Sequence, residues 1–140
     1  MAQNNGLPSI LRNLTRYSRA LRNDLTFEVL NTVTQIESKA KTKVVVDTGK
    51  LKQSIYHTMN YQNQTGEVGA TEDYAPYIEF GTGGNVSIPS GFSDLASQFK
   101  GAGVRTINRA AKPFLIPAFL EESEKFKEKV NTLITRYSGQ

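Results

Sequence analysis

A length of 140 residues corresponds to one ordinary domain, so we expect a single domain over residues 1–140. The chain has no cysteine and one histidine, His57, which excludes disulfides, zinc–cysteine sites, cysteine nucleophiles and histidine-rich metal sites. Its net charge of +4 is compatible with a nucleic-acid partner, although an ordinary soluble surface is the commoner explanation. No apolar run approaches the ~20 residues of a membrane span, so no membrane partner is expected, and no motif predicts a cofactor.

Residues 8–41 are predicted to form one long helix, because apolar residues recur every three or four positions from Ile10 to Ala40. Pro8 suits the first turn of such a helix. Four arginines share the opposite face, which makes it a candidate surface for DNA or another acidic partner, with a solvated outer face as the commoner alternative. These arginines are Arg12, Arg16, Arg19 and Arg22.

A turn and a β-hairpin are predicted next. Residues 41–50 form a hinge, with turn chemistry at Asp47, Thr48 and Gly49. Residues 51–61 alternate in part and predict a strand, and residues 65–70 predict its return strand after a turn at 62–64. His57 lies on the first strand, where a structural role is commoner than a catalytic one.

An aromatic segment over residues 74–80 surrounds a single carboxylate, that of Glu79, and is predicted to be a short helix from Pro76 or an irregular turn. Its large side chains are expected to pack the sheet against the helices, with a core or interface hydrogen bond for Glu79. The glycine-rich run at 81–85 lacks the lysine and serine or threonine of a phosphate loop, so a flexible loop entry is the better interpretation.

Residues 83–112 are predicted to be a flexible arm that meets a partner subunit, because they are rich in Gly, Ser, Asn and Ala. A short apolar stripe within the arm has no evident place in a domain framed by two helices, and the arm ends in basic residues. The stripe and the basic end that we assign to this contact are Phe92, Leu95, Phe99, Arg105 and Arg109.

The two prolines of residues 113–117 predict an edge strand or extended tether, since proline cannot donate a backbone hydrogen bond. Residues 118–137 then predict a second helix, with acidic residues in its first turns and basic residues following, as the helix dipole prefers. The fold class expected from these elements is α+β: a long N-terminal helix, a small antiparallel sheet, a long flexible arm and a C-terminal helix.

The strongest candidate for an enzymatic motif is Asp47-Thr48-Gly49, which follows three valines. Aspartic proteases place Asp-Thr-Gly after an apolar strand in the same way. Two long helices do not suit that nearly all-β fold, and Lys50 stands where the protease favours a small residue. No second glycine-rich apolar segment supports an active-site loop. The sequence therefore indicates a non-enzyme, with a free nucleic-acid-binding protein and a protease as weaker alternatives.

Four segments in this order and at this spacing, residues 46–55, 68–69, 74–82 and 113–119, resemble the neck or tail-completion proteins of long-tailed bacteriophages. This is the family named after gene product ten of a lambdoid phage. The motif residues, expected in the core or at an interface, are Asp47, Thr48, Gly49, Tyr74, Tyr77, Glu79, Phe80, Gly81, Pro113, Phe114 and Pro117.

The resemblance implies a structural virion protein, assembled in the bacterial cytoplasm, that forms a ring joining the head connector to the tail around the DNA channel. It implies six copies, with twelve as the alternative, and contacts with the connector or head-closure protein and with the tail terminator or tube. Double-stranded DNA would pass without specific binding. A tail terminator capping the tube is the alternative function. The 83–112 stretch departs from the Pro- and Lys-containing hairpin common in the family.

Overall fold

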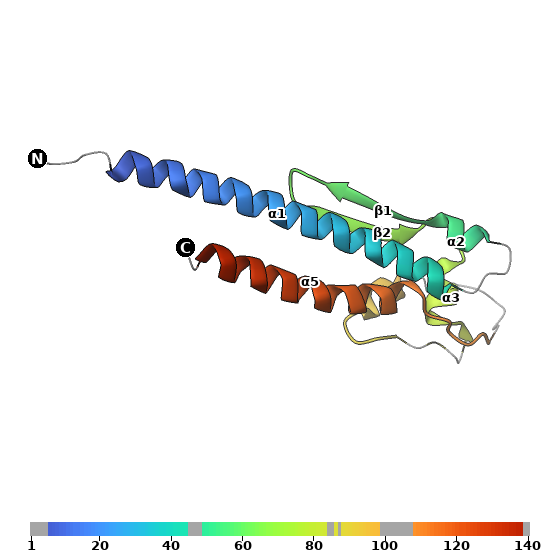
Figure 1. The fold of residues 1–140 in the computed structure, drawn as a ribbon. Helices are drawn as coiled ribbons and strands as arrows, with labels where there is room; N and C mark the ends of the chain where they lie inside the picture. Colours follow the sequence, from blue (N-terminus) through green and yellow to red (C-terminus); the bar gives the residue numbers. More distant parts are fainter. Residues whose placement is uncertain (1–5, 45–48, 84–85, 87, 99–107, 139–140) are drawn as a thin grey trace, which may run out of the picture.

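The computed structural model describes residues 6–44, 49–83, 86, 88–98 and 108–138, and it confirms the expected α+β class (Figure 1). A long N-terminal helix, a two-stranded antiparallel sheet and a long C-terminal helix form its frame. The elements in chain order are α1 (Gly6–Lys43), α2 (Lys50–Ser54), β1 (Ile55–Asn60), β2 (Thr65–Ala70), α3 (Ala75–Phe80), α4 (Ser93–Ser97) and α5 (Leu115–Ser138).

Helices α1 and α5 pack side by side in antiparallel directions, as Figure 1 shows. Three contacts between them run in opposite sequence order: Lys39 to Glu121, Glu28 to Lys129 and Asp24 to Tyr137. At 1.5 Å per residue, α1 is about 57 Å long and α5 about 36 Å. The two helices are aligned near the C-terminal end of α1, so the excess length of α1 lies at its N-terminal end.

The hairpin of β1 and β2 packs along the second half of α1 (Figure 1). Its register pairs Ile55 with Ala70 at the open end and Asn60 with Thr65 next to the turn. The Asn60 side chain accepts hydrogen bonds from the amides of Gln62 and Asn63 and so holds the turn closed. The structure thus confirms the predicted hairpin, and β2 spans the residues 65–70 that were predicted for its return strand.

Gly66 lets the hairpin approach α1 closely. A Cβ atom at this position would lie 2.4 Å from Cγ1 of Val33 and 3.1 Å from Cγ1 of Val29. Both valines belong to the face of α1 that the sheet covers, so any side chain at Gly66 would push β2 away from the helix.

The main hydrophobic core lies at the C-terminal end of α1, where α2, α3, the open end of the hairpin and the start of α5 converge. Phe114 and Ile36 are the largest fully buried side chains. The buried members of this core are Ile36, Ala40, Val44, Leu51, Ile55, Ala75, Phe114 and Ala118. The chain therefore has one packed end, from which α1 and α5 extend as a helical pair.

The predicted strand beginning at Leu51 is wrong in its first four residues, which form helix α2. Gly49 adopts φ 79°, a left-handed conformation that favours glycine, and its carbonyl accepts a hydrogen bond from the Gln53 amide. This turn directs Leu51 into the core, where it is 6% exposed. The strand begins only at Ile55, and Tyr61 lies in the turn beyond it.

The prediction of an extended tether over residues 113–117 is wrong from Leu115 onward, because α5 already begins there. Pro117 lies in the first turn of the helix, where the amide that proline lacks would have had no partner within the helix. Only Pro113 and Phe114 precede the helix.

Candidate assembly surfaces

Residues 6–19 of α1, which we call the overhang, extend beyond the rest of the chain. Asp24 of α1 contacts Tyr137 in the last turn of α5, whereas every residue from Ser9 to Arg19 is exposed. Figure 1 shows this end of α1 projecting past the end of α5 and the hairpin turn.

Large apolar side chains line the overhang. Ile10, Leu11, Leu14 and Tyr17 are between 41% and 58% exposed. Ile10, Leu14 and Tyr17 are spaced by four and three residues, and this spacing continues through Leu21 to Asp24 and Glu28, which contact α5. A helical face that packs against α5 over half of α1 is therefore left uncovered over these first turns.

The predicted arginine face divides into two parts. Arg12, Arg16 and Arg19 belong to the exposed overhang. Arg22 lies at the hairpin turn, where its guanidinium donates a hydrogen bond to the carbonyl of Gln62 at 2.7 Å. Arg22 thus fixes the hairpin to α1, whereas the other three guanidinium groups are carried by an isolated helix.

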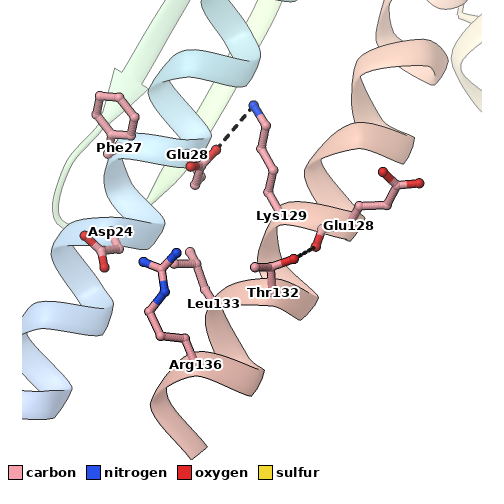
Figure 2. A pocket seen from close by; sticks show the side chains of 8 residues that line it. All are labelled: Asp24, Phe27, Glu28, Glu128, Lys129, Thr132, Leu133 and Arg136. Atoms are coloured by element: carbon pink, nitrogen blue, oxygen red, sulfur yellow. Dashed lines mark hydrogen bonds and ion pairs between the residues drawn. The ribbon is translucent and has the colours of Figure 1, made fainter.

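A groove of about 400 Å³ opens between α1 and α5 next to the overhang (Figure 2). Phe27 is 65% exposed at this groove, the largest exposed fraction among the exposed large apolar side chains of the described residues. Acidic side chains from both helices and two basic ones from α5 complete the lining: Asp24, Glu28, Glu128, Lys129, Thr132, Leu133 and Arg136.

Glu28 is incompletely paired in this groove. Its Oε2 atom is buried and has no hydrogen-bond partner among the described residues. The same atom forms an ion pair with Nζ of Lys129 at 3.5 Å, which the dashed line in Figure 2 marks. Nearby, Asp24 accepts a 2.6 Å hydrogen bond from the Tyr137 hydroxyl, which raises the pKa of that hydroxyl. These acids could not be singled out from the sequence, because nothing in their spacing shows which helix faces them.

Two ion-pair clusters fix α1 at the packed end of the molecule. Lys39 bridges from α1 to Glu121 and Glu122 of α5 at 2.6 and 2.5 Å. Burial by itself raises the pKa of Glu122, but hydrogen bonds from Lys39 and Lys125 outweigh this effect, so its pKa is lowered. Hydrogen bonds to Glu121 and Glu122 raise the pKa of Lys39.

The second cluster contains the single histidine. Glu37 pairs with Lys41 at 2.5 Å, and its other carboxylate oxygen shares a hydrogen bond with Nδ1 of His57 on β1. Lys41 and then His57 lower the pKa of Glu37. His57 therefore links the sheet to α1, which is a structural role.

Glu79 caps the N-terminal end of α5 from the neighbouring helix α3. Its carboxylate accepts three hydrogen bonds of 2.9 Å, from the amides of Phe114, Leu115 and Ile116. The side chain is 6% exposed, and these amides have no partner within the helix. The hydrogen bond expected for this carboxylate is thus present in the core, where the negative charge also faces the positive end of the helix dipole.

The other residues of the aromatic segment divide between core and surface. Phe80 is 6% exposed in a small second core with Ile116 and Ala96, and Ile78 packs against the main core. Tyr74 and Tyr77 are 38% and 40% exposed, so the expectation that both pack the sheet against the helices is wrong. Tyr77 of the short helix α3 and Tyr74, its N-cap residue, both lie on the exposed side. Gly81, which is buried, ends this helix.

Part of the 83–112 segment packs on its own chain. Phe92 lies edge-on against Phe119 of α5, with 6.4 Å between ring centroids, and contacts the small core that includes Ala96. The expectation that Phe92 has no place in this domain is therefore wrong. Leu95 points outward at 44% exposure, and the backbone of Arg109 pairs with that of Thr82 in an isolated bridge. Phe99 and Arg105 lie outside the described residues, as do Asp47 and Thr48.

A sequence model of the family described as "Bacteriophage HK97-gp10, putative tail-component" matches residues 9–81, a little over half of the chain. The chain belongs to the HK97-gp10-like family. This confirms the family resemblance and identifies the chain as a structural tail component of a bacteriophage, and hence of the virion. No curated protein and no solved structure matches the chain.

The family match covers most of the surfaces described above. It includes nearly all of α1 with its overhang, the hairpin and helix α3, and it ends at Gly81, before the arm and α5. Within the described ranges, no group of three or more His, Asp or Glu side chains is arranged to hold a metal ion. The helices of these ranges include none that is long and apolar enough to cross a bilayer.

Proposed function

We propose that this tail component is a neck protein, forming a ring that joins the head connector to the tail around the DNA channel. The observation that carries this proposal is the overhang: three turns of exposed apolar helix on a protein of a phage tail family. An apolar surface of this kind is covered when subunits assemble. A structural ring protein needs such lateral surfaces and no catalytic group, so we propose no enzymatic role.

We propose six copies in the ring, with twelve as the alternative. Six would match the symmetry of a tail tube, whereas twelve would match a portal. The partners of the ring would be the head connector or head-closure protein on one side and the tail terminator or tube on the other. The mild net charge of +4 suits a channel wall, since strong attraction for phosphates would slow the passage of DNA.

A phage that lacks this chain tests the neck position. We expect electron micrographs of its lysate to show filled heads and separate tails of normal length, because each half would be complete but unjoined. Tails of irregular length would instead indicate a tail terminator, which stops growth of the tube. Intact joined virions would contradict both positions. Supplying the chain from a plasmid should restore joined particles.

A further inference from the structure

We propose that the arginine face of the overhang binds the phosphate backbone of double-stranded DNA. This face consists of Arg12, Arg16 and Arg19, and the overhang is residues 6–19 of α1. The inference rests on the proposed ring, and it names the surface of each subunit that would lie against the DNA in the channel.

The net charge of the chain is concentrated in its first residues. Residues 1–23 contain four basic residues and no acidic one, whereas residues 24–140 contain thirteen of each. The whole excess of +4 is therefore carried by the part of the chain that includes the overhang. All four basic residues there are arginines, although ten of the thirteen further along are lysines. Because the planar guanidinium of arginine binds phosphate in a bidentate manner, this composition favours a partner that bears phosphates.

The three guanidinium groups share one side of the helix and are accessible. At about 3.6 residues per turn, Arg12, Arg16 and Arg19 lie within about 60° of one another around the helix axis. All three residues are exposed, and they form no ion pair within the ranges that the structure describes. They span about 10 Å along the helix, and three successive phosphates of one DNA strand cover a similar length, at about 3.4 Å of duplex axis each. One overhang can therefore contact about three phosphates.

The arginine face and the apolar stripe of the overhang lie on opposite sides of the helix. Ile10, Leu14 and Tyr17 are about half a turn away from the arginines. A neighbouring subunit can therefore cover the stripe while the arginine face stays open. In Figure 1 the overhang projects past α5 and the hairpin turn, so neither element covers this face. Arg22 differs, because its hydrogen bond to Gln62 holds it at the hairpin turn.

Among acidic partners, double-stranded DNA agrees best with the other observations. The chain belongs to a family of phage tail components, and the proposed ring surrounds a DNA channel. Contacts to phosphates alone carry no sequence information and let a protein slide along the duplex, so about three per subunit hold the DNA without blocking its passage. A basic amphipathic helix can also lie on an anionic membrane, and the test therefore includes vesicles.

Fluorescence anisotropy of a labelled duplex of about 30 base pairs and random sequence, titrated with the purified chain, tests the proposal. We expect the affinity to fall about 40-fold or more between 50 and 200 mM salt, as three phosphate contacts require. The triple variant Arg12→Gln, Arg16→Gln and Arg19→Gln should bind about tenfold more weakly at 50 mM salt. Vesicles of phosphatidylglycerol and phosphatidylcholine should bind the wild-type chain more weakly than the duplex does.

A second triple variant removes the same charge from exposed positions elsewhere and is the matched control. It combines Lys43→Gln, Lys52→Gln and Lys127→Gln. Its affinity for the duplex should stay within about twofold of wild type, because salt screens charges that are distant from the contact. Circular dichroism of both triple variants checks that each retains the fold.

Protection of single cysteines identifies the side of the helix that the DNA covers, since the chain has no cysteine of its own. Asn23 lies one turn beyond Arg19 on the arginine side and is exposed, whereas Leu14 belongs to the apolar stripe. Saturating duplex should slow the reaction of Asn23→Cys with a maleimide several-fold and leave the reaction of Leu14→Cys unchanged.

No binding of the duplex, equal losses in the two triple variants, tighter binding to the vesicles, or protection of Leu14→Cys alone would overturn the DNA contact. Unjoined heads and tails in the deletion phage would still support the neck in that case. Conversely, arginine-dependent binding together with intact virions in the deletion phage would reject the neck and retain the contact.

Discussion

Glu79 joins the aromatic segment to the start of α5 through three hydrogen bonds from one buried carboxylate. Charge-assisted bonds of this kind contribute more than neutral ones, and buried amides without a partner are costly. The sequence allowed this bond to be predicted, since Glu79 is the only acid among apolar neighbours. Its partners could not be predicted, because the two prolines of residues 113–117 favour an extended segment over the start of a helix.

We expect Glu79→Ala to lower the free energy of unfolding by about 3 kcal/mol, because three amides lose their acceptor. Glu79→Gln should cost about 1–2 kcal/mol, since the amide retains one acceptor oxygen but loses the charge. Urea denaturation followed by circular dichroism measures both values. The control is Glu124→Ala on the exposed face of α5, which should change stability by no more than about 0.5 kcal/mol. Equal values for Glu79→Ala and this control would contradict the capping role.

Gly66 provides a second test at the scale of one residue. Gly66→Ala should destabilise the protein by about 1–3 kcal/mol, because the added methyl group meets Cγ1 of Val33 at 2.4 Å. The double variant with Val33→Ala should lose less than the sum of the two single changes, since the smaller side chain makes room. Strictly additive losses in thermal unfolding would show that β2 does not approach α1 at this point.

The long elements were the most predictable. The apolar period from Ile10 to Ala40 predicted α1 to within two residues at each end, and the turn residues predicted the hairpin. Helix α2 was missed because its five residues are too few for a helical period to be told from strand alternation. The exposure of the overhang was not predictable either. The apolar residues of α1 keep the same spacing along the whole helix, and this spacing does not show that α5 covers only part of it.

Acid should weaken the contacts that α1 makes with α5 and with β1. The folded pKa values of Glu37, Glu121 and Glu122 are lowered, so these carboxylates stabilise the fold above the ordinary glutamate value of 4.5. That contribution is lost as the pH falls below 4.5 and through the folded values.

Lys39→Met should make the protein less stable at neutral pH and make its acid dependence less steep, because buried Glu122 would keep only Lys125 as a partner. Denaturation curves measured from pH 7 to pH 3 would check this prediction. Lys127→Met, which removes an exposed pair with Glu124, is the matched control and should follow the wild-type pH profile. An unchanged profile for Lys39→Met would contradict the role assigned to this cluster.

Within the 83–112 segment, substitution of Leu95 in helix α4 and of Phe92 at its N-cap should affect stability differently. Phe92→Ala should lower stability by about 2 kcal/mol, because Phe92 packs on Phe119 and the small core of Phe80, Ala96 and Ile116. Leu95→Ala should leave the melting temperature of the purified chain unchanged but reduce its incorporation into particles, if this outward side meets a partner. The reverse pattern would show that Leu95 belongs to the core and Phe92 to an interface.

At the scale of the whole molecule, the chain consists of a packed end and a helical pair with an uncovered extension. The packed end contains the main core and the glutamate cap, which a free subunit can form by itself. The overhang and Phe27 are parts with large apolar side chains that the described residues of a free subunit leave exposed. This division is what a subunit of a larger assembly requires: it folds alone and is completed by its neighbours.

A cryo-electron microscopy reconstruction of the virion, centred on the junction of head and tail, tests the central claim most directly. Our account predicts a ring of copies of this chain between the connector and the tail tube, with each overhang covered by a neighbouring subunit. Density for the chain at the distal end of the tail, or along the tube, would contradict it.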